Sequence, residues 1–502
     1  MSSSGVQRFT PSSGSVSQEC EQFPIVDKVE VLDNNKPQLA RAEAGNGPND
    51  HYKSKLSPLR YKIRSYFLPW IRKETELLAY VQASLRNPFL DIYFAWTANL
   101  ASHTFYVLML PLPMWFGAST MGRHLVCVLG LGIFFTGHFK DYLCLPRPRS
   151  PPLHRITMSS YTTQEYGFPS SHSANATAVT LVLFMTVMTS DYTLMVRWSL
   201  YFIFTLYYVS LIFGRIYCGM HGFLDVFFGS LIGCCVFLFR AYLGPLCDEW
   251  LFSSKSGLSL ISTPLIIISG YLLLIHFHAE PVDDCPCFDD SVAFIGVLIG
   301  LDISQWMFYF TDHLLNQNNH GDPLLIPFNY TELGPLKTLL RVVIGVGLVA
   351  TWKAVSKPII FTILPPIYKV IGVYLPRRNF EATAFTEKTT RQIRSQSLSN
   401  MNEQEHGTEF HGFINKNEIG PENDIDIYEI LAYEEEKKKK GQQSNKASSP
   451  DVEPETTISG VFRPRYDVEI VGRLIVYAGV AFMAQWGFAL STEFLGLNCR
   501  DL

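Results

Sequence analysis

The sequence predicts an all-α integral membrane protein, a multi-pass bundle of about eight to ten transmembrane helices. Hydrophobic residues make up 47% of the 502 residues and charged residues only 17%, a balance too apolar for an ordinary soluble protein. The apolar residues are gathered in runs of about 15 to 25, the length that crosses the hydrocarbon core of a bilayer. A net charge of −4 excludes the general basic character of a nucleic-acid binder. We therefore expect membrane lipids as partners and no nucleic acid.

Composition divides the chain into six regions. Two are polar and poor in aliphatic residues, so we expect them to be disordered, and one mixes basic with aromatic residues, as a helix in the headgroup plane does. The regions are a disordered N-terminal segment (1–56), an interfacial basic and aromatic segment (57–90), a membrane core (91–245), additional transmembrane helices (246–375), a disordered polar insert (376–466) and a final transmembrane helix with the C-terminus (467–502).

Ten apolar runs are candidates for membrane helices. They cover 92–116, 121–139, 173–189, 198–214, 226–243, 257–277, 291–311, 336–354, 357–375 and 472–490. The ninth run contains Pro365 and Pro366, which makes its boundaries the least regular. Cysteines within the runs, such as Cys127 and Cys234, are interpreted as small packing residues.

Ionisable residues gather between these runs in three clusters. The first extends from Lys140 to Pro148, the second from Gly167 to Ser173, and the third from Arg215 to Asp225. Ionisable groups are costly at membrane depth, so a chain that places them at helix ends is using them for a site.

The residue types of the clusters favour an anion as the ligand. Lys140, Arg147 and Arg215 supply one ammonium and two guanidinium groups, which match the non-bridging oxygens of a phosphate. Ser170 and Ser171 can add hydroxyl and backbone N–H donors, and a helix that begins near Ser173 would point its positive end at the same place.

Two histidines and a carboxylate complete a set suited to phosphate transfer. His221 and Asp225 are four residues apart, so the carboxylate can orient the imidazole and leave its other nitrogen as the nucleophile. His172 then remains as the acid that protonates the leaving group. The cations would stabilise the charge on the equatorial oxygens, and this chemistry requires no metal and no cofactor. Each residue has an ordinary structural explanation when taken singly, and the joint arrangement carries the hypothesis.

The three clusters resemble the signature motifs of the lipid phosphate phosphatase superfamily, the type 2 phosphatidic acid phosphatases related to vanadium haloperoxidases: K-x6-R-P, P-S-G-H and S-R-x5-H-x3-D. The resemblance implies these roles: phosphate binding by Lys140, Arg147, Ser170 and Arg215, with Ser171 beside them, acid catalysis by His172, nucleophilic attack by His221 and orientation by Asp225.

Two positions depart from the motifs. Ser171 replaces the glycine of the second motif, and Gly214 replaces the serine before Arg215. The first change is shared by the branch that acts on sphingoid base phosphates, as is the Gly-Met-His sequence ending at His221. The stretch 281–288, which contains Cys285 and Cys287, is similar to fungal long-chain base phosphate phosphatases, and we favour a loop over a metal site there because no ligand spacing is characteristic.

The resemblance implies hydrolysis of a phosphorylated sphingoid lipid to the free base and phosphate through a phosphohistidine. Three alternatives stay open at this point: the same chemistry on phosphatidate, transfer of the phosphoryl group to an alcohol, and transport of a phosphorylated solute. The superfamily also implies a location in the endoplasmic reticulum membrane with a lumenal site.

Counting the ten runs places all three clusters on one membrane face. The same count places the N-terminus and the C-terminus on that face, and the 376–466 insert on the other. The basic stretch 53–73 would then lie in the lumen, against the positive-inside tendency. Asn329 begins a glycosylation sequence on the face opposite the site, so its modification would argue against a lumenal site.

Overall fold

The structure, a computed structural model, describes residues 44–101, 103–157, 164–253, 259–283, 285–315, 326–371, 466 and 468–498. Residues 1–43, and all of the predicted 376–466 insert except Tyr466, lie outside the described residues. Within the described part, every element is helical, which confirms the predicted all-α class.

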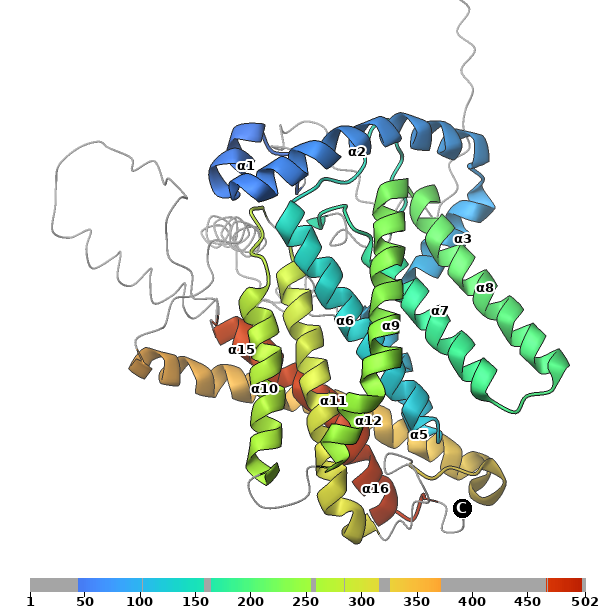
Figure 1. Ribbon diagram of the computed structural model, residues 1–502. Helices are drawn as coiled ribbons and strands as arrows, with labels where there is room; N and C mark the ends of the chain where they lie inside the picture. Colours follow the sequence, from blue (N-terminus) through green and yellow to red (C-terminus); the bar gives the residue numbers. More distant parts are fainter. Residues whose placement is uncertain are drawn as a thin grey trace, which may run out of the picture. The chain divides into compact units, whose positions relative to one another are not determined.

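Eight helices in the described residues are long and apolar enough to cross a membrane, within the predicted range (Figure 1). They are α6 (Ser119–Leu143), α7 (Ser171–Thr189), α8 (Leu194–Tyr217), α9 (Phe223–Ser253), α10 (Ser259–Phe277), α11 (Cys287–Leu315), α12 (Tyr330–Ile371) and a run in which α15 (Val468–Phe482) continues through a π-helical turn (Met483–Gly487) into α16 (Phe488–Phe494).

Helix α7 lies between α6, α8 and α9 at the centre of the predicted core. Two glycines of α9 allow its backbone to touch that of α7. A Cβ atom at Gly229 would lie 2.3 Å from the carbonyl oxygen of Ser170, and one at Gly233 would lie 2.2 Å from that of Ala174. Small residues at such crossings let membrane helices approach closely. The start of α7 is thereby held against α9.

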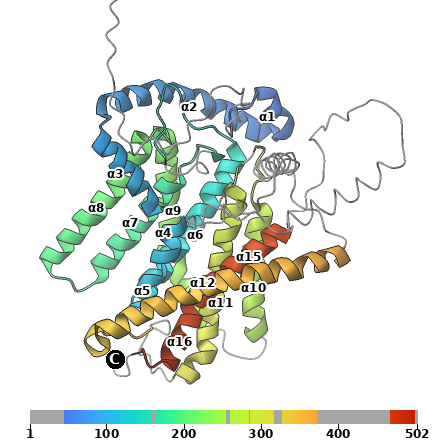
Figure 2. The ribbon, with the colours of Figure 1, turned by 180° about the vertical axis from the view of Figure 1, so that it is seen from behind.

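The prediction of one membrane helix over 92–116 is wrong. The structure divides this stretch into α3 (Pro88–Ala98), a 3₁₀ turn (Asn99–Ala101), α4 (His103–Met109) and α5 (Pro111–Trp115). Pro111, which lacks a backbone N–H donor, is the first residue of α5 and separates it from α4. No proline lies at the 3₁₀ turn. The pieces still lead from one end of the bundle to the other (Figure 2).

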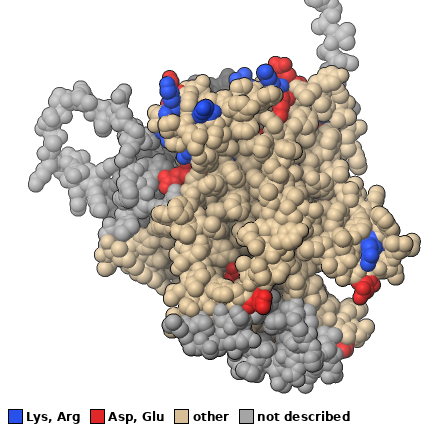
Figure 3. All heavy atoms as spheres, viewed as in Figure 1, with Lys and Arg blue, Asp and Glu red and all other residues tan. Residues whose placement is uncertain are grey.

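Helix α2 (Pro58–Leu85) covers one end of the bundle, which we call the capped end. Arg60 donates hydrogen bonds to the carbonyl oxygens of Asp141 (2.7 Å) and Tyr142 (2.8 Å) at the end of α6. The helix occupies the predicted interfacial segment, but one of its faces is buried on the protein. In the view of Figure 3, Lys and Arg side chains gather at the end of the molecule over α1 (Asn49–Lys55) and α2.

The predicted disordered segment extends too far, because residues 44–56 have a defined structure. Tyr52 of α1 is fully buried, and its hydroxyl donates a hydrogen bond to Asp283 at 2.6 Å. The backbone N–H of Gly45 donates to the same carboxylate at 2.8 Å. A long-range partner, which composition does not reveal, thus compensates for the entropy of ordering this segment.

The two predicted helices 336–354 and 357–375 form the single helix α12, kinked at Gly334 (φ +68°). Its interior prolines do not end it, since neighbours in a membrane bundle can satisfy the freed backbone groups. The helix is longer than the hydrocarbon core is thick and lies obliquely across the other helices (Figures 1 and 2), as hydrophobic mismatch requires.

Because the two predicted helices are one, the chain crosses the bundle once less than we counted. The expected sides of the 376–466 insert and of the C-terminus are therefore exchanged. Tyr368 near the end of α12 donates a hydrogen bond to the Tyr466 carbonyl oxygen at 2.9 Å, and the Tyr466 ring stacks on His276, near the end of α10 that faces the capped end. The insert is therefore attached on the side of the capped end. The C-terminal helix runs from the capped end toward the opposite end of the bundle, which we call the far end. There Trp115 donates a hydrogen bond to the Ala484 carbonyl oxygen at 2.7 Å.

Gln82 joins α2 to the bundle through three hydrogen bonds. Its amide nitrogen donates to the carbonyl oxygens of His154 (2.7 Å) and Tyr217 (2.8 Å), and its oxygen accepts from the His154 N–H (2.8 Å). We expect Gln82→Ala to destabilise the protein by about 1–3 kcal/mol, because it leaves buried backbone groups unpaired. Thermal unfolding of the detergent-solubilised protein measures this, with the exposed Glu76→Ala on the same helix as the control. An equal effect of both substitutions would contradict the assigned role of Gln82.

Candidate active site

The three predicted clusters meet at the capped end of the bundle. The Arg147 guanidinium lies 3.2 Å from Nε2 of His221, which joins the first cluster to the third. The Ser170 N–H donates to the Asp225 carbonyl oxygen at 3.0 Å, which joins the second to the third. Lys140 donates to the Ser171 hydroxyl at 3.0 Å, which joins the first to the second. All eight predicted site residues therefore belong to one neighbourhood, with His172 in the first turn of α7.

Lys140 and Arg147 are buried cations that share an anion. The Lys140 ammonium is paired with the Glu165 carboxylate, and Nη2 of Arg147 lies 3.7 Å from the same carboxylate. Arg147 also donates to the carbonyl oxygens of Glu165 (3.0 Å) and Met220 (2.9 Å). Burial lowers the pKa of Arg147 to about 10, so it remains charged at neutral pH. Both cations thus face the same anionic group, the Glu165 carboxylate.

Arg215 ends α8 and is 5% exposed. Within the described part of the chain its Nε atom has no hydrogen-bond partner. A buried guanidinium with an unused donor is unfavourable unless a ligand completes it. This open donor supports the predicted role of Arg215 in binding an anion.

The imidazole of His221 is held from both sides in the loop between α8 and α9. Nδ1 lies 2.9 Å from the carbonyl oxygen of Gly167 and 3.5 Å from the Asp225 carboxylate. A carbonyl only accepts hydrogen bonds, so Nδ1 carries the proton, and the unprotonated Nε2 accepts from the Arg147 guanidinium. Burial, followed by the charge of Arg147, lowers the pKa of His221 well below its usual value.

The predicted helical spacing of His221 and Asp225 is not what orients the ring. Helix α9 begins at Phe223, so His221 lies before the helix, and the closest partner of Nδ1 is a backbone carbonyl. Asp225 accepts the Gly222 N–H at 2.8 Å and thereby shapes the loop. Its carboxylate lies 3.5 Å from Nδ1, farther than the hydrogen bond that the four-residue spacing predicted, and its role in orienting the imidazole stays a prediction.

Ser170 caps the helix that presents His172. Its hydroxyl accepts the Ser173 N–H at 3.3 Å, and α7 begins at Ser171, two residues before the predicted start. Ser170 is fully buried, whereas Ser171 and His172 are partly exposed. The charge of His172 is one of the influences that lower the pKa of His221, so the two rings lie within electrostatic range.

The sequence prediction missed Glu165, Gly167 and Glu74. Glu165 pairs with the cations but lies two residues before the second cluster. Gly167 begins that cluster, but it contacts His221 through its backbone carbonyl, a role that no side chain indicates. Glu74, on α2, accepts the Leu224 N–H at 3.2 Å at the start of α9, and burial raises the pKa of its carboxyl. Only the charge of Glu165 so near the second cluster could have indicated it.

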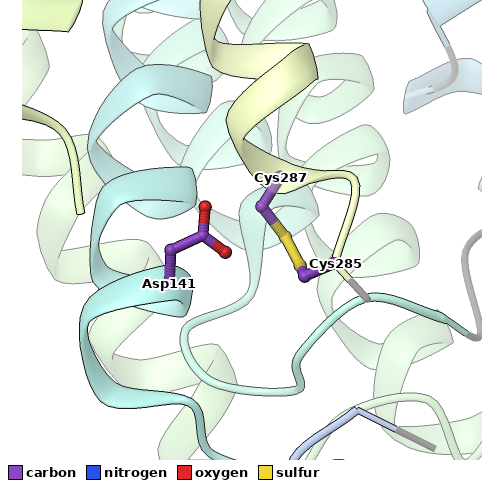
Figure 4. A group of neighbouring side chains, drawn as sticks. All are labelled: Asp141, Cys285 and Cys287. Atoms are coloured by element: carbon purple, nitrogen blue, oxygen red, sulfur yellow. A yellow bond between two sulfur atoms is a disulfide. The ribbon is translucent and has the colours of Figure 1, made fainter. Parts of the chain in front are cut away.

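Cys285 and Cys287 form a disulfide beside the buried Asp141 at the capped end (Figure 4). The side chains of these three residues are close enough for a shared ion, but thiolates are the form of cysteine that binds metals, and a disulfide has none. Residues 281–283 and 285–286 lie outside helices, and α11 begins at Cys287. The preference for a loop over a metal site stays a prediction. Cys127 is a buried free cysteine, whereas Cys235 is exposed.

Comparison with known proteins matches the part of the chain that contains these residues. Residues 122–246 match the model of the PAP2 superfamily. The chain is 40% identical to dihydrosphingosine 1-phosphate phosphatase YSR3 of Saccharomyces cerevisiae over 64% of its own length and 76% of the relative's. It is 33% identical to dihydrosphingosine 1-phosphate phosphatase C823.11 of Schizosaccharomyces pombe over 85% of this chain and 89% of the other. A probable sphingosine-1-phosphate phosphatase of Dictyostelium discoideum is 28% identical over 60% of this chain and 74% of its own. No solved structure matches the chain.

We expect Arg147→Lys to lower kcat/KM by at least about a hundredfold, although it keeps the charge, because a lysine cannot replace several directed donors. Phosphate release from a lipid phosphate measures this. Arg149→Lys, an exposed position two residues away, serves as the control and should leave the rate unchanged. Retained activity in Arg147→Lys would show that only the positive charge is needed.

The lowered pKa of His221 predicts the pH dependence. A nucleophilic imidazole must be unprotonated, and a lowered pKa keeps it so to lower pH, so the acid limb due to His221 should lie below pH 6.5, the ordinary pKa of the ring. The measurement is kcat/KM against pH, corrected for the second ionisation of a phosphate monoester near pH 6. A corrected limb centred above pH 6.5 would contradict the described environment of the ring.

Proposed function

The chain belongs to the PAP2 superfamily and, within it, to the phosphatases of sphingoid base 1-phosphates, and from this premise we propose that it hydrolyses long-chain base 1-phosphates such as dihydrosphingosine 1-phosphate. The products are the free base and inorganic phosphate. The reaction serves sphingolipid metabolism, and the eight membrane helices give the enzyme direct access to a substrate that resides in the bilayer.

The chemistry proceeds in two steps. The phosphate oxygens accept hydrogen bonds from Lys140, Arg147 and Arg215. The Ser170 and Ser171 groups at the start of α7 add further donors. Nε2 of His221 then forms a bond to phosphorus as the bond to the lipid oxygen breaks, and His172 gives its proton to that oxygen. In the second step a water molecule gives a proton to His172 and attacks phosphorus, which releases phosphate and restores His221.

One observation carries this proposal: the contact between Arg147 and Nε2 of His221 at 3.2 Å, with Nδ1 on the Gly167 carbonyl oxygen. The first contact puts the lone pair of the nucleophile beside a phosphate-binding guanidinium. The second stabilises the tautomer in which Nε2 carries no proton. Burial of the site adds to the strength of both interactions.

We further propose that the protein resides in the endoplasmic reticulum membrane with its site facing the lumen. The Cys285–Cys287 disulfide at the capped end supports this side, since disulfides persist in oxidising compartments. Asn329 precedes α12 at the far end, which would then be cytosolic. Glycosylation of Asn329, detected as an enzyme-sensitive mass shift absent from Asn329→Gln, would contradict the proposed orientation.

The function is tested by phosphate release from a panel of lipids that includes dihydrosphingosine 1-phosphate and phosphatidate. We expect the sphingoid lipid to be preferred, and activity to persist in chelator. His221→Ala should lower kcat by several orders of magnitude, because nucleophilic catalysis is lost. Preference for phosphatidate would show instead a lipid phosphate phosphatase that acts on glycerolipids. Loss of activity in chelator would overturn the metal-independent mechanism.

A further inference from the structure

An apolar cavity of about 220 Å³ lies inside the bundle. One face of α11 lines it along its length, with side chains at the spacing of successive helical turns: Asp290, Ala293, Phe294, Val297 and Leu301. The other walls come from α4, α5, α12, α15 and the π-helical turn, with Val126 of α6. Apart from Val126, this lining lies outside residues 122–246, which match the superfamily model, so most of the cavity is formed by helices beyond the shared catalytic core.

The cavity begins beside the candidate active site. Asp290 is in the first turn of α11, at the capped end, and its electrostatic neighbours include Lys140 and Glu165. On another wall, Tyr106 of α4 has Arg215 among its electrostatic neighbours. From these residues the lining continues to Trp115 and Ala484 at the far end of the bundle. None of the candidate site residues lines the cavity itself, but a ligand in it would have one end directed toward the cations of that site.

Among the described residues, Asp290 and Lys353 are the two charged members of this lining, Asp290 on α11 at the capped end and Lys353 on α12. Asp290 is 7% exposed, and no hydrogen bond or ion pair joins its carboxylate to another of the residues that the structure describes. Its neighbour Asp289 differs, because the Asp289 carboxylate lies 3.8 Å from Arg473. A buried carboxylate without a partner is costly, so the mouth of the cavity favours a ligand that brings a positive charge.

We propose that this cavity binds the hydrocarbon chain of the sphingoid base and that Asp290 binds its ammonium group. The inference rests on the proposed function and names what selects its substrate. In a sphingoid base 1-phosphate the amino-bearing carbon follows the carbon that carries phosphate, and the chain continues beyond it. The protein presents its binding groups in the same order. Lys140 and His221 would hold the phosphate, Asp290 the ammonium group, and the stretch from Ala293 to Leu301 the hydrocarbon chain.

This arrangement separates sphingoid phosphates from glycerolipid phosphates. Phosphatidate has no amine, so it would leave the Asp290 carboxylate buried without a partner. Sites that bind a polar group of the substrate reject analogues that lack it, because the protein group is then unpaired. Asp290 is thus a specificity-determining residue, separate from the groups that act on phosphorus.

The test compares dihydrosphingosine 1-phosphate with octadecyl phosphate, a single-chain monoester without an amine. The wild type should prefer the amine-bearing lipid. Asp290→Asn should lower kcat/KM for dihydrosphingosine 1-phosphate at least about tenfold, since a charge-assisted hydrogen bond is lost, and leave octadecyl phosphate within about twofold. Asp289→Asn is the matched control and should preserve the preference. Equal losses on both lipids, or no preference in the wild type, would overturn the role of Asp290.

A second variant tests the chain site independently. Ala484→Leu narrows the far end of the cavity, so it should lower kcat/KM for an 18-carbon base phosphate at least about fivefold more than for an eight-carbon one. Ala241→Leu, on α9 and away from the cavity lining, is the control. An unchanged chain-length profile would overturn the cavity as the chain site. Absence of phosphate release from every lipid by the wild type would instead refute the proposed function.

Discussion

The burial of three cations at one end of an apolar bundle is the constraint on which the rest of the structure depends. Lys140, Arg147 and Arg215 are each at most 5% exposed, and unpaired charges at such depth would not be tolerated. Glu165 balances the first two, while the Nε atom of Arg215 keeps an unused donor. The charges at this end of the bundle therefore leave a donor for an anion, as the proposed phosphate-binding role of these cations requires.

The surrounding elements can be understood as the support for this charged centre. The glycines of α9 bring it against the start of α7, so that a helix N-terminus faces the cations. Helix α2 closes the same end through Gln82 and Arg60. The loop between α8 and α9 is short enough to hold the His221 ring under a single backbone carbonyl. Few of these contacts are made by catalytic groups, yet they set the positions of all of them.

The sequence was sufficient to predict the helical class and the convergence of eight candidate site residues, because lipid requires long apolar runs and phosphate chemistry requires particular side chains. The roles of these eight residues stay predictions. Other features could not be predicted from the sequence, and the reasons are physical. Backbone partners such as the Gly167 carbonyl have no side-chain signature. Run length also cannot reveal that a helix boundary falls at Pro111 whereas α12 continues through Pro358, because neighbouring helices decide both outcomes. Residues 44–56 are ordered by Asp283, a contact across more than two hundred residues.

The account's central claim is that His221 attacks phosphorus inside the assembled pocket. The most direct measurement is rapid-quench trapping with dihydrosphingosine 1-phosphate labelled in its phosphate group. The account predicts a label that is stable to base and labile to acid, carried by the peptide that contains His221 and absent from His221→Ala. Turnover without any phosphoenzyme in a time-resolved series, or a label on another residue, would contradict it.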